Sequence, residues 1–325
     1  MKSNQPAVTI LVPMCHSEQF LPRCLASLQA QSLSNLEILC LDDGSTDDSV
    51  KIARLFARQD KRFKIIKCKH LDFSAIINQG ISLAHGEYLG FVDNRDWVEP
   101  EMAAYLYARA HKYQVDLITS NGYWEQFDDQ KHQRQLLPLQ TLQTNLAFEW
   151  REQLMLPPTT LYTALYRTQF LRHHLFQFSS LAKNCSCDTT FALAAFGEAE
   201  KICLVQRIFY HHCLQPHSAA ISRKQAQNVL KEYRALTKRW QQQQQLTRFA
   251  AVLTASKYRV YQWCAGHLPL SAAQDFLRQA QNDLLTQKQA GYLQTRLLTH
   301  FFARLDLWLL MYYPTLYAYK AKFTS

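Results

Sequence analysis

The stretch Gly86-Glu87-Tyr88-Leu89-Gly90-Phe91-Val92-Asp93-Asn94-Arg95-Asp96-Trp97 decides the fold of this chain, because a short apolar run leads directly into an acidic turn. We predict that residues 87–92 form a buried strand and that Asp93 and Asp96 follow its carboxyl end. In an open α/β sheet, ligands bind in the crevice beyond the carboxyl ends of the strands. Acidic side chains at this point are therefore placed to hold a metal ion or to meet a sugar.

A second acidic turn closes an earlier apolar run in the same manner. Residues 36–41 read as a strand, and the sequence Asp42-Asp43-Gly44-Ser45-Thr46-Asp47 follows it. We expect the acidic side chains of the two turns to converge in a single cleft at the carboxyl edge of the sheet. Two carboxylate-bearing strand ends in one sheet indicate a site for a nucleotide and its divalent cation.

Short β-rich runs alternate with segments of helical periodicity over the first part of the chain. We predict strands at residues 8–13, 36–41, 63–66, 87–92 and 115–119, with helices at 18–31, after a cap at Ser45 or Thr46, at 74–84, and from Pro100. Near-continuous apolar strands alternating with helices predict an α/β fold with a mostly parallel sheet flanked by helices.

The chain becomes helical in pattern from about Ile221 onward. We therefore predict one domain over residues 1–220 and a helical C-terminal extension over residues 221–325. The run Gln241 to Gln245 lies inside this basic helical stretch, and we interpret it as an exposed helix face.

Composition narrows the class of partner. The 325 residues are 48% hydrophobic, which supports a packed core, and the formal net charge is +10. Such a charge favours an anionic partner: nucleic acid, an anionic lipid surface or a phosphate-rich substrate. We find no nucleic-acid-binding motif, so we expect no nucleic-acid partner. The first residues show no signal-peptide pattern and the nine cysteines are scattered, so we expect a cytoplasmic protein with reduced thiols.

Six short motifs follow one another in order: Val12-Pro13, Glu18, Asp42-Asp43-Gly44-Ser45-Thr46-Asp47, Asn78-x-Gly80, Gly86-Glu87-Tyr88 and Asp93-x-x-Asp96-Trp97-Val98. This succession resembles the family 2 glycosyltransferases over residues 8–121, and more weakly to about Ser222. The resemblance implies the GT-A fold and transfer of a sugar from a nucleotide donor to an acceptor hydroxyl, usually with inversion. It also implies a bacterial surface glycan as acceptor, such as lipopolysaccharide or capsule, and we expect a UDP-linked donor.

The resemblance further implies roles for individual residues. Pro13 and Glu18 would line the nucleoside pocket, Asp43 would accept a hydrogen bond from the base or ribose, and Asp93 would lie near the ribose and diphosphate. Asp188 matches the second member of the family's Glu-Asp pair and would be the catalytic base that takes the proton of the acceptor hydroxyl. An aspartate at this place also suits an ordinary helix N-cap, and the two roles are compatible.

Arg95 departs from the family pattern most clearly. It occupies the place of the usual cation ligand in an Asp-Ser-Asp-Asp motif, and arginine cannot ligate a metal. The guanidinium could partly replace the cation and meet the diphosphate itself. Alternatively, Mg²⁺ or Mn²⁺ stays on Asp93 or Asp96 with Arg95 turned outward, or catalysis is impaired. Together with Cys187, which replaces the first residue of the catalytic pair, Arg95 favours as an alternative a catalytically degenerate relative that binds a glycan or a partner enzyme.

The segment His212-Cys213-Leu214-Gln215-Pro216-His217-Ser218 resembles the family's Tyr-Arg-x-x-Pro-Gly-Ser. His217 is therefore a candidate for contact with the diphosphate or a metal. We interpret His211 and His212 as structural or surface residues.

Aromatic and basic residues are combined at residues 300–323. Aromatics with flanking cations suit a membrane interface, in which a helix lies in the headgroup plane. The alternative is that this helix packs against the catalytic domain or a second subunit. The apolar run Leu307 to Tyr313 is too short to span a bilayer, which needs roughly 20 residues. Because relatives modify lipid-linked glycans, the cytoplasmic face of the inner membrane is a candidate location and a lipid-linked glycan a candidate acceptor.

Overall fold

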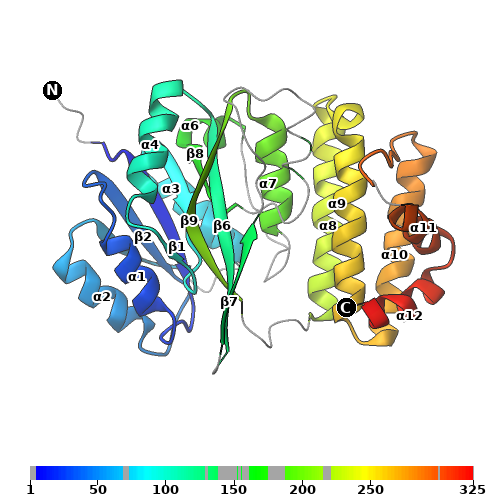
Figure 1. The fold of residues 1–325 in the computed structure, drawn as a ribbon, viewed down its shortest axis with the longest axis horizontal. Coiled ribbons are helices and arrows are strands. Elements are labelled where there is room, and N and C mark those ends of the chain that lie inside the picture. Colours follow the sequence, from blue (N-terminus) through cyan, green and yellow to red (C-terminus); the bar gives the residue numbers. More distant parts are fainter. Residues whose placement is uncertain are drawn as a thin grey trace. The chain divides into compact units, whose positions relative to one another are not determined.

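The structure is a computed structural model that describes residues 5–68, 73–128, 131–137, 152, 155, 161–174, 187–214, 221–298 and 301–324 (Figure 1). The chain divides into two compact units. The first contains residues 1–150, 160–180 and 198–216, and the second contains residues 151–159, 181–197 and 217–325. Because segments before residue 220 group with the C-terminal helices, the domain boundary between residues 220 and 221 stays a prediction.

A nine-stranded sheet forms the centre of the first unit, in the order β3-β2-β1-β4-β8-β6-β9-β5, with β7 paired to β6. The bounds are β1 Val8–Met14, β2 Leu36–Asp42, β3 Phe63–Lys67, β4 Tyr88–Phe91, β5 Trp97–Val98, β6 Leu117–Asp128, β7 Lys131–Leu137, β8 Ala164–Arg167 and β9 Ile202–Leu214. Strands β3, β2, β1 and β4 are parallel neighbours. Strand β8 is antiparallel to both β4 and β6, and β6 and β9 are parallel.

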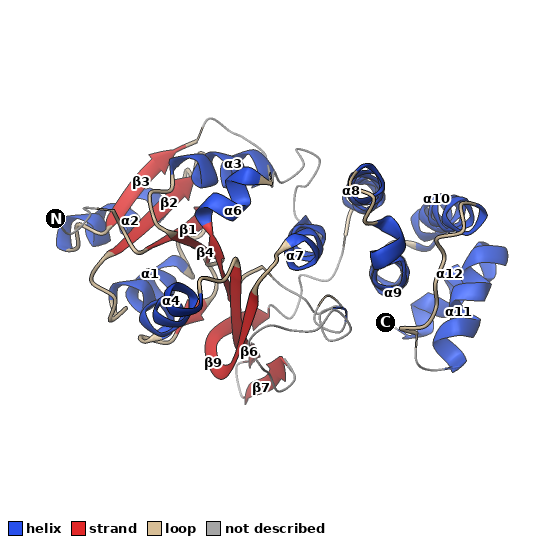
Figure 2. Cartoon of the chain, turned by 90° about the horizontal axis from the view of Figure 1, so that it is seen from above, coloured by secondary structure: helices blue, strands red, loops and turns tan. Residues whose placement is uncertain are grey.

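Helices cover both faces of this sheet. The helices α1 (Leu21–Gln29) and α4 (Met102–Tyr113) lie on one face, and α3 (Phe73–Leu83) and α6 (Thr168–His173) lie on the other (Figure 2). The helix α2 (Ser49–Gln59) contacts α1 and β3. All residues of β1, β2 and β4 are buried, as expected for strands with helices on both sides. The predicted α/β fold with a mostly parallel sheet flanked by helices is confirmed.

The register of the parallel strands determines where the site can form. Met14 at the end of β1 pairs with Asp42 at the end of β2, and Leu11 pairs with Phe91 in β4. The loops that follow these three strands therefore leave the same edge of the sheet. This is the carboxyl edge at which the sequence predicted a ligand.

Gly86 allows β4 to start close against β1. A Cβ atom at this position would lie 2.4 Å from the backbone nitrogen of Thr9 and 2.7 Å from the carbonyl oxygen of Tyr88. The Gly86 N–H also donates to the Thr9 hydroxyl oxygen at 2.8 Å. Backbone atoms on both sides cannot move away, so only glycine fits here.

Three sequence predictions in this unit need correction. The strand predicted at residues 115–119 begins at Leu117 and continues to Asp128, and β5, β7, β8 and β9 were not predicted. The helix expected to be capped by Ser45 or Thr46 has Asp48 as its N-cap residue. Ser45 is occupied elsewhere, because its N–H donates to the Asp42 carboxylate and its hydroxyl accepts from the His16 N–H.

The second unit is helical. Its helices are α7 Cys187–Glu198, α8 Arg223–Gln242, α9 Leu246–His267, α10 Leu270–Gln289, α11 Phe301–Tyr312 and α12 Pro314–Thr324. Helix α8 begins with a capping box in which Ser222 and Gln225 satisfy each other's backbone N–H groups. Buried aromatic residues from α8 and α9 fill the interior, among them Tyr233, Trp240 and Tyr261.

The glutamine run lies only partly on a helix: Gln241 and Gln242 are exposed residues of α8, as predicted, whereas Gln243 to Gln245 form the turn to α9, which corrects the sequence interpretation. Helix α8 ends at Gln242, and α9 begins at Leu246. Gln244 between them has a φ of 57°, in the left-handed region. A left-handed residue directly after a helix ends it and reverses the chain.

Helices α11 and α12 each have one buried and one exposed face. Leu307, Leu310, Met311 and Tyr317 are buried, and the two helices contact α10, with α12 also contacting α9. The packing partner is therefore the helical unit itself, whereas the sequence suggested the catalytic domain or a second subunit. The opposite face exposes large apolar side chains: Phe302, Leu305, Trp308, Tyr312, Tyr313, Leu316 and Tyr319. None of the described helices is long and apolar enough to cross a membrane.

Candidate functional site

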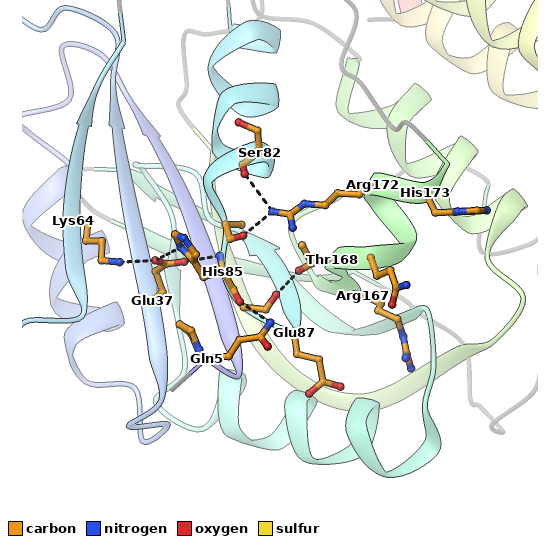
Figure 3. A pocket seen from close by; sticks show the side chains of 14 residues that line it. Gln5, Glu37, Lys64, Ser82, His85, Glu87, Arg167, Thr168, Arg172 and His173 are labelled. Atoms are coloured by element: carbon orange, nitrogen blue, oxygen red, sulfur yellow. Dashed lines mark hydrogen bonds and ion pairs between the residues drawn. The ribbon is translucent and has the colours of Figure 1, made fainter. Parts of the chain in front are cut away.

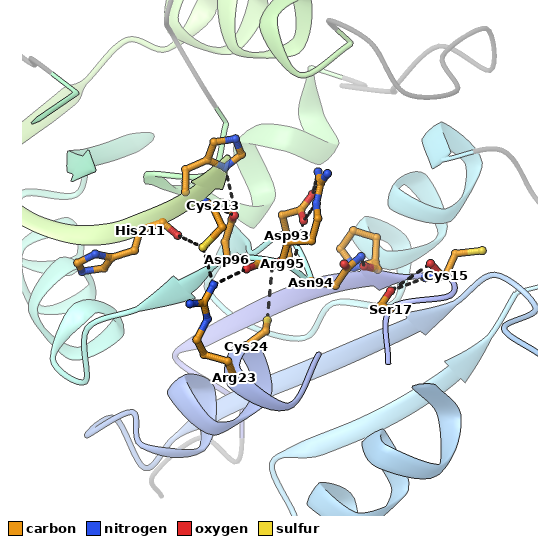
Figure 4. Close-up of polar contacts among 12 residues, drawn as sticks. Cys15, Ser17, Arg23, Cys24, Asp93, Asn94, Arg95, Asp96, His211 and Cys213 are labelled. Carbon is orange, nitrogen blue, oxygen red and sulfur yellow. Dashed lines mark hydrogen bonds and ion pairs between the residues drawn. The ribbon is translucent and has the colours of Figure 1, made fainter. Parts of the chain in front are cut away.

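The loops that follow β1, β2 and β4 meet at the carboxyl edge of the sheet (Figure 4). Several hydrogen bonds connect them, two of which involve residues at the strand ends. The Asn94 side-chain amide donates to the Pro13 carbonyl oxygen at 2.8 Å, and the Asp43 N–H donates to the Met14 carbonyl oxygen at 3.1 Å. The three predicted residues Pro13, Asp43 and Asp93 therefore belong to one connected edge.

Asp43, in the loop after β2, has a carboxylate oxygen whose hydrogen-bonding capacity the described residues do not use. Its Oδ1 atom is buried and meets no hydrogen-bond donor among the described residues. A buried acceptor without a donor costs about 1–3 kcal/mol, and a charged one costs more. An N–H or O–H group of a ligand would remove this cost, and the role of Asp43 in binding a nucleoside stays a prediction.

Glu18 fastens the loop after β1 to the start of α2. Its carboxylate accepts from the Asp48 N–H at 2.9 Å, and its own N–H donates to the Asp47 carboxylate at 3.1 Å. His16, at a φ of 47°, contacts the Thr46 hydroxyl through Nε2 at 3.0 Å. These contacts give Glu18 a role in holding the loop, and its predicted contact with a nucleoside stays a prediction.

Arg95 folds back onto Asp93 in the turn after β4. The Arg95 Nε and Nη2 atoms donate to the two carboxylate oxygens of Asp93 at 2.9 and 3.2 Å, and the Arg95 N–H donates to Oδ1 at 3.0 Å. Burial alone would raise the pKa of Asp93, but the hydrogen bonds and charge of Arg95 outweigh it and lower the pKa. Asp93 is 8% exposed, whereas the Arg95 side chain is 39% exposed. The carboxylate is therefore ionised beneath a guanidinium that reaches solvent.

Asp96 is fully buried and held by β9. It accepts hydrogen bonds from the Tyr210 hydroxyl at 2.6 Å, from His212 Nδ1 at 2.7 Å and from the Cys213 N–H at 2.9 Å. The Tyr210 hydroxyl also accepts from the Asp93 N–H at 3.1 Å. Burial would lower the pKa of His212, but the adjacent Asp96 carboxylate outweighs it and raises the pKa. Strand β9 thus positions the whole acidic turn.

The sequence interpretation of His212 as a structural or surface residue is incomplete, because His212 joins the candidate site. Tyr210 and His212 are two apart in a strand, so both side chains point to the same face. This alternation in the sequence was the available signal. His211 points to the other face, where it lies buried between the carboxylates of Glu125 and Glu99 and stacks on Trp97. His211 is therefore structural, as predicted.

A model of the family described as glycosyl transferase family 2 matches residues 9–175, which is half of the chain. This chain belongs to glycosyl transferase family 2. The matched span includes the loops that carry Asp43 and Asp93 and ends before β9. The Tyr210 and His212 contacts therefore lie beyond the part of the chain that the family model covers.

Individual relatives agree with this assignment. The uncharacterized glycosyltransferase EpsJ of Bacillus subtilis is 33% identical over 220 residues, which cover 66% of this chain and 62% of EpsJ. The chain thus matches less than two thirds of the length of EpsJ. Staphylococcus aureus TarS 1-349, solved in complex with UDP-GlcNAc, is 16% identical with a TM-score of 0.68, covering 98% of this chain and 90% of that one.

A second solved structure is the mannosyltransferase PcManGT from Pyrobaculum calidifontis in complex with GDP-Man and Mn²⁺. It is 14% identical with a TM-score of 0.55 and covers 98% of this chain and 87% of PcManGT. At such identities, these two likenesses concern the fold alone. They confirm the GT-A fold expected of a family 2 member.

The predicted catalytic residue Asp188 lies in the first turn of α7, which begins at Cys187. It therefore lies inside the helix and not at the N-cap position. The side chains of Cys187 and Asp188 are outside the described residues, and so is His217. The role of Asp188 as the base stays a prediction.

The donor atoms at the acidic turn do not fit a divalent cation. Both oxygens of Asp93 accept from Arg95, and both oxygens of Asp96 accept from groups of β9. Among the described residues, no group of three His, Cys, Asp or Glu side chains could hold a metal ion. A cation at this turn would have to displace a guanidinium or break a buried network. Asp93 and Asp96, predicted as uncertain metal ligands, are thus used for other contacts here.

A cavity of about 1230 Å³ lies at the opposite, amino edge of the sheet (Figure 3). The central group is Glu37, with a side chain that is 2% exposed. Its oxygens accept from the Thr9 hydroxyl at 2.7 Å, from Lys64 Nζ at 2.7 Å and from the backbone N–H of His85 at 2.9 Å, and the His85 ring lies at 3.0 Å.

The chemistry of this amino edge is structural. Burial alone would raise the pKa of Glu37, but its hydrogen bonds with Lys64, His85 and Thr9 lower it to about 2. Arg172 donates to the carbonyl oxygens of Ile81, Ser82 and Ala84 and so satisfies the C-terminal end of α3. These polar groups hold three strands and a helix together, and they already have protein partners.

Proposed function

We propose that this chain transfers a sugar, with inversion, from a UDP-linked donor to a hydroxyl of a bacterial surface glycan such as lipopolysaccharide or capsule. The observation that carries the proposal is the buried, unpartnered Oδ1 atom of Asp43 at the carboxyl edge. A uracil base or a ribose offers the N–H or O–H donor that this atom lacks. The UDP-GlcNAc in the TarS structure supports the choice of nucleotide, and the family supports transfer of a sugar.

In this proposal, individual residues have distinct roles in donor binding and catalysis. Asp43 orients the nucleoside, Pro13 and Glu18 lie along its pocket, and Asp93 with Arg95 lies near the ribose and diphosphate. Asp188 takes the proton of the acceptor hydroxyl, whose oxygen then attacks the anomeric carbon. The bond from that carbon to the diphosphate oxygen breaks in the same displacement, so the configuration inverts and the nucleoside diphosphate leaves.

Nucleotide binding is the first test. Calorimetric titration with UDP, GDP, CMP and dTDP should show a preference for UDP. Slow release of UDP from UDP-GlcNAc without an acceptor would show that the site is active. Binding of UDP without any hydrolysis or transfer would contradict catalysis and favour the degenerate, glycan- or partner-binding alternative. Absence of binding by every nucleotide would contradict the proposed site.

The role of Asp188 is tested by Asp188→Asn. Loss of a general base lowers turnover by about 10²–10⁴-fold, while the affinity for UDP should stay unchanged. Asp275→Asn on α10 is a matched control, because the Asp275 side chain is 56% exposed and lies on another helix. Equal turnover in Asp188→Asn and Asp275→Asn would show that Asp188 is not the base.

The exposed aromatic face of α11 and α12 supports docking on an anionic membrane surface, such as the cytoplasmic face of the inner membrane. Phe302 is 73% and Trp308 is 47% exposed. The net charge of +10 is complementary to anionic lipid. Membrane docking would bring the chain to lipid-linked acceptors.

Vesicle co-sedimentation tests this surface. The chain should sediment with phosphatidylglycerol vesicles and much less with phosphatidylcholine vesicles. The variant Phe302→Ser/Trp308→Ser should bind at least roughly a hundredfold more weakly, since two large apolar side chains contribute about 1.5–3 kcal/mol each when fully buried and about 1.4 kcal/mol corresponds to tenfold. Trp263→Ser is the control, because Trp263 is 45% exposed but lies on α9. Undiminished binding of the double variant would remove this surface from the proposal.

A further inference from the structure

Transfer from a nucleoside diphosphate sugar leaves negative charge on the departing diphosphate. An enzyme needs a positive group there, either a divalent cation or a cationic side chain. The turn after β4 offers no suitable set of cation ligands among the described residues, as shown above. It offers Arg95 instead.

We propose that the Arg95 guanidinium takes the place of the divalent cation, so that this chain binds its nucleotide without a metal ion. The inference rests on the proposed function, because it concerns the diphosphate of the same donor. Two N–H donors of the guanidinium group point at Asp93, and a guanidinium has five. Three therefore face away from Asp93, on a side chain that is 39% exposed. Guanidinium groups bind phosphate oxygens in this way, often through two parallel hydrogen bonds.

The charge balance at the turn supports the replacement of a divalent cation by Arg95. Placing an arginine where a carboxylate ligand would stand changes the local charge from −1 to +1. This change of two units equals the charge that a divalent ion would bring. The turn thus carries the same total charge with Arg95 as with an aspartate and a bound metal.

The surroundings hold Arg95 in place for this task. Asp93 fixes the guanidinium through two contacts and is itself fixed by the Tyr210 hydroxyl. The Arg95 carbonyl oxygen accepts from Arg23 Nη2 at 3.3 Å, which brings a second cation to the same turn (Figure 4). A pre-positioned cation loses little freedom when the diphosphate arrives.

Asp96 cannot take over as a cation ligand without dismantling this turn. It is 0% exposed and its oxygens accept from Tyr210, His212 and Cys213. A metal at Asp96 would have to displace these donors from a buried carboxylate. The arrangement therefore favours the guanidinium over the alternative of a metal on Asp93 or Asp96.

UDP titrations by calorimetry, in metal-free buffer with EDTA and again with excess MnCl₂, test the proposal. The wild-type chain should bind UDP with the same affinity in both. Arg95→Gln should bind roughly tenfold to a hundredfold more weakly in both, because a charged hydrogen-bonding group is lost. Arg95→Asp should lose binding in EDTA and regain it with MnCl₂. Arg95→Lys should keep an intermediate, metal-independent affinity.

A second readout does not depend on nucleotide. Electron paramagnetic resonance of free Mn²⁺ should show no binding to the wild type and binding to Arg95→Asp, with thermal unfolding confirming that each variant is folded. Wild-type UDP binding that requires MnCl₂ would overturn the role of Arg95 and leave the proposed function standing. Failure of the wild type to bind any nucleotide in either buffer would overturn both.

Discussion

The two edges of one sheet differ in how their polar groups are satisfied. At the amino edge a cavity of about 1230 Å³ is lined in part by Glu37, which receives hydrogen bonds from three neighbouring residues. At the carboxyl edge Asp43 has a buried oxygen without a donor among the described residues, and Arg95 keeps donors directed away from its partner. Within the described part of this sheet, the position of an acceptor without a donor at the strand ends, and not the size of a cavity, is therefore the reason why we propose the carboxyl edge as the ligand site.

Gly86→Ala should have the largest effect on stability, because it disrupts the packing of β4 against β1 at the amino edge of the sheet. The new Cβ would meet backbone atoms of Thr9 and Tyr88 at 2.4 and 2.7 Å, so β1 and β4 would have to separate. We expect a loss of more than about 4 kcal/mol of unfolding free energy, or failure to fold. Urea unfolding measures it. The control Gly291→Ala has open space around its Cβ and only the cost of a φ of 77°, about 1 kcal/mol. Equal losses in the two variants would contradict the close approach.

Glu37→Gln should destabilise the fold by at most about 3 kcal/mol, because solvent around the exposed Lys64 and His85 side chains screens part of the interaction, and it should leave UDP affinity unchanged. The estimate follows from the lowering of the pKa of Glu37 from 4.5 to about 2. Paired urea-unfolding and calorimetric measurements separate the two quantities. Weaker UDP binding by this variant at full stability would indicate that the nucleotide binds at the amino edge and not at the carboxyl edge.

Low pH should remove the stabilisation that the Glu37 carboxylate provides. Since the folded-state pKa of Glu37 is depressed, its contribution to the free energy of unfolding is present above pH 4.5 and is lost as the pH falls towards 2. The stability difference between the wild type and Glu37→Gln should therefore shrink over this range. A difference that stays constant down to the lowest measurable pH would show that the carboxylate charge is not the cause.

Asp43→Asn should weaken UDP binding and leave stability unchanged, which is the reverse of the result expected for Glu37→Gln. Loss of a charged acceptor should weaken UDP binding by about 2 kcal/mol, or roughly thirtyfold. Stability should be equal or slightly higher, because the wild-type oxygen is buried without a partner in the described structure. Calorimetry and urea unfolding check the two parts. A stability loss as large as that of Glu37→Gln would make Asp43 a structural residue.

His212→Gln should have the smallest effect, about 1 kcal/mol, because glutamine keeps a hydrogen-bond donor towards Asp96, and that effect should depend on pH. Because the folded-state pKa of His212 is raised above 6.5, the pair with Asp96 contributes fully below pH 6.5. The contribution is lost as the pH rises through the raised pKa. Comparison of wild type and variant at about pH 6 and about pH 9 measures it. A larger difference at the higher pH would contradict the raised pKa.

The parts of the fold that the sequence predicted well depend on local patterns. Continuous apolar runs predicted β1, β2 and β4, and the strand-end rule placed Asp43 and Asp93 at one edge. The contacts of Asp96 could not be predicted in this way, because its partners lie in β9 and come together with it only through the sheet order. The turn at Gln244 was missed because a glutamine run has no intrinsic signal for a left-handed residue.

The bond between Tyr210 and Asp96 joins residues 114 positions apart, so the acidic turn depends on a late part of the chain. During synthesis, β1, β2 and β4 leave the ribosome well before β9. At roughly 5–20 residues per second, the turn would wait about 6–23 seconds for its tyrosine, histidine and cysteine partners. A nascent chain that ends before β9 could therefore pair its first strands, yet it could not offer a finished pocket to the abundant nucleotides around it.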